Sequence, residues 1–435
     1  MTRIALLSSE PLREKVGGIG VRYLELARRL PREGLEVVAL SPAAPEETPL
    51  PAGAVRPFAA GRLRELLADC DGAVGQGQLA NDLLLECPEL PVAVDLYDPW
   101  LVENLHYAPE LGLDPYRNDH ATWVLQLSRG DFFLCSSEEQ RLFYLGFLAA
   151  LGRVNPRRLA ADPDLVGLIA PVPFGVPEEL PPHRPLLGPR TGAAGERRLL
   201  FGALYDWYDP WTLLDALELL EDRGAERAWT LLFVRHPDPE GTPQRLLREV
   251  EARCRDRGWW GSRVRAIDWV PADRRYDLLR DVDLLVAPHR PSLETRLSLR
   301  TRFLDALAAG CPVVTSEGGT LSRRLREAGA GWVVPPGDPA ALAAALEQAL
   351  AEAPLGGGAR AAGARALAGS FAWERVLEPL VAFCRAPRRD ETKEDFAFRP
   401  PTLAPPDELG LRLRRRVRAG LRRLAARASR AGAGR

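Results

Sequence analysis

Short apolar runs alternate with amphipathic segments along most of this 435-residue chain, and the alternation occupies two separate stretches. In the first stretch, runs with the length and composition of buried strands lie at residues 4–8, 36–40, 72–75, 92–96, 132–135 and 168–171. In the second, they lie at residues 198–203, 229–234, 264–269, 283–287, 312–315 and 331–334. Strands that alternate with helices are typical of parallel β-α-β units, so we predict an α/β fold with two Rossmann-like, doubly wound parallel-sheet domains.

Segments with apolar residues at helical spacing lie between these runs, at residues 21–32, 137–152, 210–222, 243–257, 272–280, 298–309, 321–328, 339–351 and 373–384. A stretch rich in Pro and Gly, from about residue 171 to 195, interrupts the pattern and indicates an interdomain linker. We therefore predict a first domain over residues 1–178, a linker over 179–197 and a second domain over 198–385. Ligands of such folds bind at the carboxyl ends of the strands, so we expect a central cleft between the domains.

The last fifty residues, 386–435, differ in composition from the rest of the chain. Residues 386–406 are polar and rich in Pro, so we expect little order there. From residue 411 to the end there are ten arginines and no acidic residue, and removing those ten charges from the net −1 leaves about −11 for the preceding part. An apolar stripe of Leu413, Val417, Leu421 and Leu424 within the basic segment 411–430 fits a helix on an anionic membrane surface, and a solvated tail fits equally well.

Composition excludes several classes of protein. No apolar run approaches the roughly 18 residues that span a bilayer, and the first residues lack the long apolar core of a signal peptide. The six cysteines show no metal-binding or redox spacing, which fits a cytoplasmic location. The acidic body argues against a nucleic acid partner. We interpret three Asp-x-Asp pairs as structural and predict no metal and no cofactor; the pairs are Asp69/Asp71, Asp162/Asp164 and Asp281/Asp283.

The stretch over residues 300–314 combines a charged helix with a sharp stop and a buried strand. Arg302 and Asp305 stand three residues apart and so share one helical face. Gly310 suits the left-handed position past a helix end, and Pro312 cannot continue the helix. A cation for a diphosphate and a carboxylate for a ribose diol would together hold a nucleotide. The alternative is that Arg302 and Asp305 pair with each other on a surface helix.

Other candidate residues follow the ends of predicted strands. Gly17 and Gly18 precede a helix and would expose backbone N–H groups to an anion, although the third glycine of a dinucleotide fingerprint is missing. Asp95 and Asp98 end a strand of the first domain, where carboxylates would bind the hydroxyls of a sugar acceptor; the alternative is a capped turn in which Asp98 and Pro99 start a helix. Arg290 follows a strand of the second domain and would face a diphosphate, and the alternative there is a solvated loop.

These segments resemble a retaining GT-B glycosyltransferase, and most closely the glycosyltransferase family 4 group, over roughly residues 1–385. The resemblance is strongest at residues 302–314, at the glycines Gly318 and Gly319, and at residues 329–338. It implies that Asp305 binds the donor ribose and that Arg302 lies near the diphosphate. It also implies that Gly17 and Gly18 form the N-terminal glycine loop.

The chain departs from the family pattern in two places. The family usually has a glutamate eight residues before the ribose carboxylate, and here that position is Leu297; Glu294 would replace it if the loop bends differently. The family also commonly places an arginine and a lysine after the first strand of the second domain, and residues 201–209 contain neither. Arg300 and Arg302 would then supply the catalytic positive charge, with Arg290 as a further donor contact.

The predicted activity is sugar transfer, with retention, from a nucleoside-diphosphate sugar to a carbohydrate or polyprenyl-linked acceptor. The resemblance implies a role in cell-surface polysaccharide or glycoconjugate synthesis, in the cytoplasm or at the inner face of the membrane. Two alternatives stay open at this point. One is a sugar-nucleotide epimerase of the same fold. The other is a catalytically impaired protein that only binds a nucleotide-sugar, because Leu297 lacks the usual carboxylate.

Overall fold

The computed structural model describes residues 1–42, 47–51, 53–189, 196–224, 229–236, 244–352 and 358–396. Residues Met1–Ala397 form one compact unit. The basic segment 411–430 and its apolar stripe lie outside the described residues, so the expectations about them remain predictions. The predicted domain boundaries at residues 178 and 198 also remain predictions.

The first sheet has seven parallel strands in the order β3-β2-β1-β4-β5-β6-β7. Their bounds are β1 Arg3–Leu7, β2 Glu36–Ser41, β3 Val55–Pro57, β4 Gly72–Gly75, β5 Val92–Asp95, β6 Phe132–Cys135 and β7 Ile169–Pro171. The predicted strands are confirmed, and β3 was missed because it is a three-residue edge strand. The strand order reverses between β1 and β4, so the loop after β1 opens into the crevice where ligands of such sheets bind.

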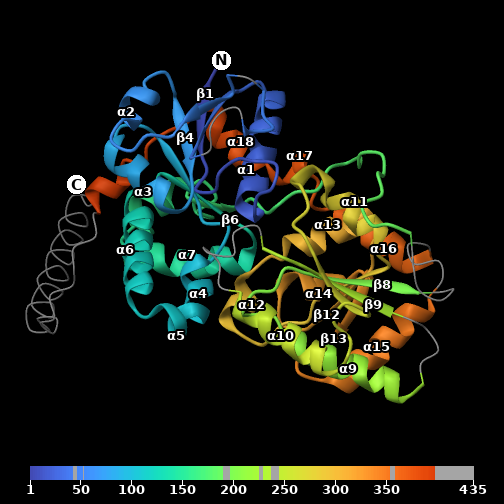
Figure 1. The fold of residues 1–435 in the computed structure, drawn as a ribbon. Coiled ribbons are helices and arrows are strands. Elements are labelled where there is room, and N and C mark those ends of the chain that lie inside the picture. Colours follow the sequence, from blue (N-terminus) through green and yellow to red (C-terminus); the bar gives the residue numbers. More distant parts are fainter. Residues whose placement is uncertain are drawn as a thin grey trace, which may run out of the picture. The chain divides into compact units, whose positions relative to one another are not determined.

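The second sheet has six parallel strands in the order β10-β9-β8-β11-β12-β13. Their bounds are β8 Arg197–Gly202, β9 Trp229–Val234, β10 Val264–Ile267, β11 Leu284–Val286, β12 Val313–Ser316 and β13 Gly331–Val334. All six were predicted. The order here reverses between β8 and β11. Two doubly wound parallel sheets confirm the predicted fold class (Figure 1).

Helices cover both sheets. Around the first sheet these are α1 Gly18–Arg29, α2 Leu63–Leu66, α3 Gly77–Glu86, α4 Trp100–Asn104, α5 Ala108–Leu111, α6 Asp114–Arg129, α7 Glu138–Ala150 and α8 Pro156–Ala161. Around the second they are α9 Pro210–Asp222, α10 Arg245–Asp256, α11 Arg275–Asp281, α12 Leu293–Leu297, α13 Thr301–Ala309, α14 Thr320–Glu327, α15 Pro339–Ala351 and α16 Gly358–Gly369. The chain closes with α17 Trp373–Val376, α18 Glu378–Arg385 and α19 Thr392–Asp395.

Helices α3 and α6 were missed, and their shared interface explains why. It is polar: Asn81 of α3 donates to Thr122 of α6 at 3.0 Å, and Gln126 of α6 donates to Asn81 at 3.0 Å. All three side chains are buried. An apolar stripe at helical spacing is the signal of a packed helix in a sequence, and a polar interface removes that signal.

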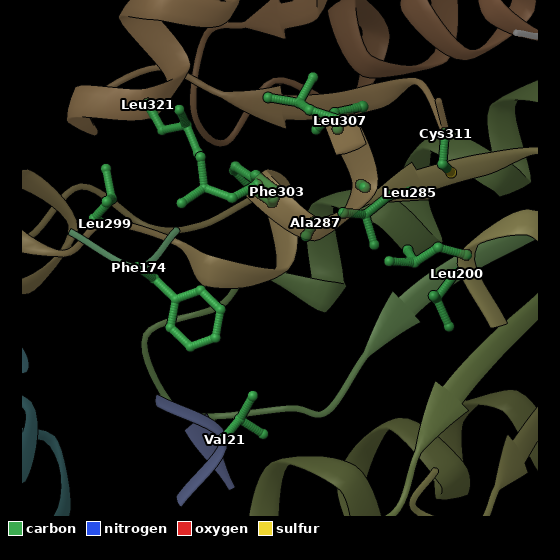
Figure 2. Packing of buried hydrophobic residues seen from close by; sticks show 14 of the residues in the cluster. Val21, Phe174, Leu200, Leu285, Ala287, Leu299, Phe303, Leu307, Cys311 and Leu321 are labelled. Atoms are coloured by element: carbon green, nitrogen blue, oxygen red, sulfur yellow. The ribbon is translucent and has the colours of Figure 1, made fainter. Parts of the chain in front are cut away.

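The predicted helix over residues 298–309 is shorter than expected. Residues Ser298 and Arg300 have extended backbone, and α13 begins at Thr301. Gly310 ends α13 with φ 72°, the left-handed conformation that glycine adopts without strain. Phe303 and Leu307 of α13 pack among apolar side chains that include Leu285 and Leu321 (Figure 2). This buried face fixes the helix that carries Arg302 and Asp305.

The C-terminal part of the described chain returns to the first sheet. Phe383 of α18 stacks on Phe132 of β6 with ring centroids 5.4 Å apart, and Figure 1 shows α18 beside the first sheet although it belongs to the other end of the sequence. Residues 386–396, which we expected to have little order, also pack there. Asp390 is buried and accepts a hydrogen bond from Arg153 at 2.7 Å, so the expectation was wrong for this segment.

No helix in the described part of the chain is long and apolar enough to cross a membrane.

Candidate functional site

A cavity of about 450 Å³ lies where the carboxyl ends of the two sheets face each other. On the side of the first sheet it is lined by the loops after β1 and β5, the start of α1, helix α4 and the turn after α4; these residues include Glu10, Gly17, Gly18, Tyr97, Asp98, Glu103, Asn104 and Tyr107. From the second sheet it is lined by the loops after β8, β9 and β10 and by α11 and α13, including Gly202, Tyr205, Trp207, Tyr208, His236, Trp269, Arg275, Arg300, Arg302 and Asp305. A cleft at this place was predicted from the topology.

Arg302 does not pair with Asp305, so the alternative of a simple surface ion pair is wrong. The guanidinium of Arg302 donates to the carbonyl oxygens of Phe201 and Ala203 at 2.9 and 3.0 Å. These carbonyls flank Gly202, whose φ is 90° and where a Cβ would lie 2.9 Å from Arg302 Nη1. The loop after β8 therefore contains no Lys or Arg, but its carbonyl oxygens bind the guanidinium of Arg302 from α13.

Asp305 pairs with a different arginine. Arg275 Nε donates to Asp305 Oδ1 at 3.2 Å, and Arg275 Nη2 lies 3.5 Å from Glu25 Oε1 on α1. Burial raises the pKa of Asp305, and the Arg275 charge together with a hydrogen bond from Tyr276 opposes that rise. Asp305 thus lies in the cavity beside a cation that also contacts the first domain.

Arg300 and Glu294 form a buried, bidentate ion pair. Arg300 Nη1 and Nη2 each donate to one carboxylate oxygen of Glu294 at 2.7 Å, and Glu294 has no exposed side-chain surface. Burial lowers the pKa of Arg300, but the Glu294 carboxylate outweighs this and raises it. The Arg300 and Arg302 guanidiniums lie 5.0 and 4.5 Å from the ring centroid of Tyr208. Glu294 therefore acts on the cavity through Arg300.

Leu297 takes no part in the cavity lining. It is 5% exposed and belongs to an apolar cluster that contains Leu101 and Val102 of α4. The position that carries a carboxylate in the family pattern is thus a packing position in this chain.

The glycine loop after β1 carries its own anion. Glu10 Oε2 accepts a hydrogen bond from the backbone N–H of Gly20 at 2.9 Å, and its carboxyl also accepts from Gly17. Burial raises the pKa of Glu10, and these hydrogen bonds oppose the rise. The N–H groups expected to meet a ligand anion are therefore shared with Glu10.

Two further carboxyl groups line the cavity from the first domain. Burial, and then repulsion by Asp95 and Glu10, raises the pKa of Asp98 to about 7. Burial and the neighbouring Asp98 raise the pKa of Glu103, and the nearby Arg300 charge opposes the rise. Asp95 itself is not brought to the cavity, because it forms a buried ion pair with Arg22 at 2.7 Å.

Three other predicted site residues lie elsewhere. Gly318 and Gly319 line a second cavity of about 380 Å³, with Glu139, Arg296, Arg323 and Arg326 among its other residues. Arg290 is exposed and is not part of the lining of the first cavity. Within the described ranges, no group of three or more His, Cys, Asp or Glu side chains could hold a metal ion.

Sequence reasoning missed several lining residues. Glu10 directly follows Ser8-Ser9 after β1, and its place before a glycine loop was a usable signal. Tyr205 and Trp207, whose ring centroids lie 4.9 Å apart, belong to the stretch 201–209 in which the expected arginine and lysine are missing. Glu103 and Arg275 gave no signal, because their position depends on how short helices pack.

Comparison with known proteins agrees with this architecture. Residues 196–352 match the family described as glycosyl transferases group 1. The D-inositol 3-phosphate glycosyltransferase of Jonesia denitrificans is 29% identical over 232 residues, which make up 51% of this chain and 52% of that protein. The chain therefore spans about half the length of this curated relative.

Solved structures match more of the chain at lower identity. Sucrose-phosphate synthase from Thermosynechococcus elongatus is 17% identical, with a TM-score of 0.61 over 88% of this chain and 98% of that one. HepE from Anabaena, solved in complex with UDP-glucose, is 15% identical, with a TM-score of 0.56 over 88% and 100%. We conclude that the chain has the GT-B glycosyltransferase fold and that residues 196–352 of it are similar to the glycosyl transferases group 1 family.

Proposed function

We propose that this chain transfers a sugar, with retention, from a nucleoside-diphosphate sugar to a hydroxyl group of a carbohydrate or lipid-linked acceptor. One observation carries the proposal. The cavity between the sheets has a wall with three arginines, Arg275, Arg300 and Arg302, and an opposite wall with carboxylates. An anionic donor and a hydroxyl acceptor fit these two walls.

The donor would bind on the second domain. Asp305 offers a carboxylate for the ribose diol, and His236 and Trp269, at the ends of β9 and β10, offer aromatic faces for a base. HepE, which shares this fold, is solved with UDP-glucose, and this supports UDP as the first nucleotide to test.

Arg302 would stabilise the leaving diphosphate. Its guanidinium is held by two carbonyl oxygens, and no carboxylate pairs with it among the described residues, so its charge is available to a ligand. Arg300 would contribute less because Glu294 neutralises it. Charge placed in advance where negative charge develops is a large source of rate acceleration in enzymes.

The test is a thermal-shift screen with UDP-, GDP-, dTDP- and ADP-sugars. We expect one nucleotide-sugar to raise the melting temperature, and Asp305→Asn and Arg302→Ala each to abolish that shift. Asp114→Asn and Arg117→Ala, at an exposed ion pair on α6, are the matched controls and should keep it. An undiminished shift in both cavity variants would remove the assignment of the donor site.

Membrane association is a separate part of the proposal. The basic segment 411–430 would bind anionic lipid at the inner membrane face and bring the cavity to a polyprenyl-linked acceptor used in surface glycan synthesis. Full-length protein should co-sediment with liposomes containing anionic lipid, and a variant ending at residue 407 should not. Equal co-sedimentation of both proteins would refute the membrane role.

A further inference from the structure

The charges that line the main cavity are separated by domain. The described lining residues from the first domain include three acids, Glu10, Asp98 and Glu103, and no Arg, Lys or His. The lining residues from the second domain include Arg275, Arg300, Arg302 and His236, with Asp305 as the only acid among those described. The cavity therefore has an acidic wall, made of Glu10, Asp98 and Glu103, and a basic wall.

The acidic wall is not neutralised from behind. Asp98 makes no hydrogen bond or ion pair within the part of the chain that the structure describes, and the Ser298 hydroxyl near Glu103 donates its proton to Glu294 at 2.7 Å. Glu10 accepts from two backbone N–H groups. Arg22, whose charge acts on Asp98, is itself bound to both carboxylate oxygens of Asp95.

A second observation concerns the aromatic side chains beside this wall. Tyr107 of the first domain and Trp207 of the second both line the cavity, and their ring centroids lie 6.2 Å apart. Aromatic rings offer large apolar faces, and carboxyl groups accept hydrogen bonds from hydroxyls. The cavity thus combines apolar faces with hydrogen-bond acceptors, a combination that suits a ring bearing hydroxyl groups.

We propose that the acceptor moiety entering this cavity carries no anionic group, and that it is a neutral or amine-bearing polyol ring whose hydroxyls donate to Asp98 and Glu103. This inference rests on the proposed function and deepens it. The curated relative from Jonesia denitrificans is named for a phosphorylated acceptor, D-inositol 3-phosphate. This chain would differ, because a phosphate dianion would be brought beside the three carboxyl groups of the acidic wall, and juxtaposed like charges oppose binding.

The physical reason is the direction of hydrogen bonding as much as charge. Sugar hydroxyls and ammonium groups can donate to a carboxylate, whereas a phosphate dianion has no proton to donate. Burial already raises the pKa of all three carboxyl groups, which means that the cavity disfavours negative charge at this wall. An acceptor linked to lipid through a phosphate still fits, provided that the phosphate lies outside the cavity.

The experiment compares acceptors in matched pairs with full-length protein and the nucleotide-sugar found in the thermal-shift screen. The pairs are inositol with inositol 3-phosphate, glucose with glucose 6-phosphate, and glucosamine with glucosamine 6-phosphate. Nucleotide release measures turnover, and calorimetry on the UDP-bound protein measures acceptor binding. We expect that, in at least one pair, the unphosphorylated compound is turned over or bound at least about tenfold better than its phosphate ester.

Three results would overturn the inference: a phosphate ester that acts as well as or better than its parent, equal binding of both members, or no effect of any unphosphorylated member in either measurement. The double variant Asp98→Asn/Glu103→Gln should reduce the preference for the unphosphorylated acceptor over its phosphate ester by about tenfold. Asp114→Asn should leave that preference unchanged. The wild-type comparison stands even if the double variant does not fold. Failure of the proposed function is distinguishable, since it would appear as no nucleotide-sugar binding at all.

Discussion

At the scale of single residues, the ion pair of Glu294 and Arg300 shows that a residue near the site can act through another. Both side chains are buried, and their contact is bidentate. Glu294→Ala would leave the Arg300 charge buried and unpaired, which typically costs about 3–5 kcal/mol. We therefore expect a large fall in the free energy of unfolding, measured by urea denaturation.

The matched control for this variant is Glu138→Ala, which removes an exposed partner of Arg141. Exposed pairs contribute at most about 1 kcal/mol, so this change should be small. Similar effects of the two variants would mean that Glu294 is not a buried structural partner and that its role as a direct donor contact has to be reconsidered.

Asp98 makes a second prediction at this scale, because its pKa differs between the folded and unfolded states. The folded protein binds the Asp98 proton with a pKa of about 7, well above the ordinary carboxyl value of 3.8. Between these values the folded state binds more protons than the unfolded state, so the contribution of Asp98 makes stability fall as pH rises from about 4 to about 7.

Asp98→Asn removes this contribution. The variant should gain stability relative to wild type across that range, reaching at least about 1 kcal/mol at pH 8, where the difference levels off. Urea denaturation at pH 4, 6 and 8 measures it, and Asp114→Asn should show no such trend. Parallel curves for Asp98→Asn and wild type would show that the carboxyl is not perturbed.

At the scale of elements, the loop after β8 and helix α13 act as one unit. Gly202→Ala would place a Cβ 2.9 Å from Arg302 Nη1 at a φ of 90°. We expect a loss of stability of about 1–3 kcal/mol from the backbone and weaker binding of UDP, because Arg302 is displaced from its two carbonyls. Thermal unfolding and calorimetry with UDP separate the two effects.

Gly261→Ala is the matched control for this variant. Gly261 has a φ of 86° and open space where a Cβ would lie, so its substitution causes the same backbone strain without touching Arg302. It should lose stability but keep its affinity for UDP. If both variants bind UDP equally well, the position of Arg302 does not matter for the nucleotide.

How much the sequence predicts also becomes clear at this scale. Apolar strands such as Val313–Ser316 were predicted because every residue in them is buried, and a run of apolar residues is a local signal. Arg302 and Asp305 were expected on one face of a helix from their spacing and from the Gly310 stop, and both line the cavity. Their partners were not predictable, because Arg275 and the carbonyls of the β8 loop come close only when separate elements pack.

Leu297 marks the same limit. From the sequence alone, Leu297 indicated a missing carboxylate and hence impaired catalysis. In the structure its side chain packs in an apolar cluster with residues of α4, and the nearby Glu294 forms an ion pair with Arg300. Position 297 could be a lost functional carboxylate or a packing position, and the choice depends on which face of the short helix α12 it occupies. Five residues are too few for periodicity to reveal that face.

At the scale of the molecule, contacts cross between the two sheets beside the cavity. Trp269 Nε1 donates to the carbonyl oxygen of Val16 at 3.1 Å, and the N–H of Ala272 donates to that of Glu14 at 2.8 Å. Arg275 joins Asp305 to Glu25. A ligand at the proposed donor site that bound Asp305 would therefore also affect Arg275 and its contact with Glu25 of α1.

The segment over residues 386–396 makes the last prediction, because it ties the end of the described chain to the first sheet. Asp390 pairs with Arg153 and with Arg158, each at 2.7 Å, and Asp390 and Arg153 are both almost completely buried. Asn155 donates to Thr392 at 3.0 Å, and Lys393 pairs with Asp131 at 2.7 Å. A chain ending at residue 396 keeps these contacts, whereas a chain ending at 385 leaves the Arg153 charge buried without its carboxylate.

We therefore expect the two truncations to differ sharply although only eleven residues separate them. Loss of one partner from a buried pair typically costs about 3–5 kcal/mol, so the protein ending at 385 should have a much lower melting temperature or fail to fold. The protein ending at 396 should have a melting temperature close to that of the full-length protein. The point variant Asp390→Ala, made in the full chain, should reproduce most of the loss, because the same two arginines lose their partner. If the truncations instead melt together, the segment only rests on the first sheet, and the stability of that sheet comes from its own strands and helices.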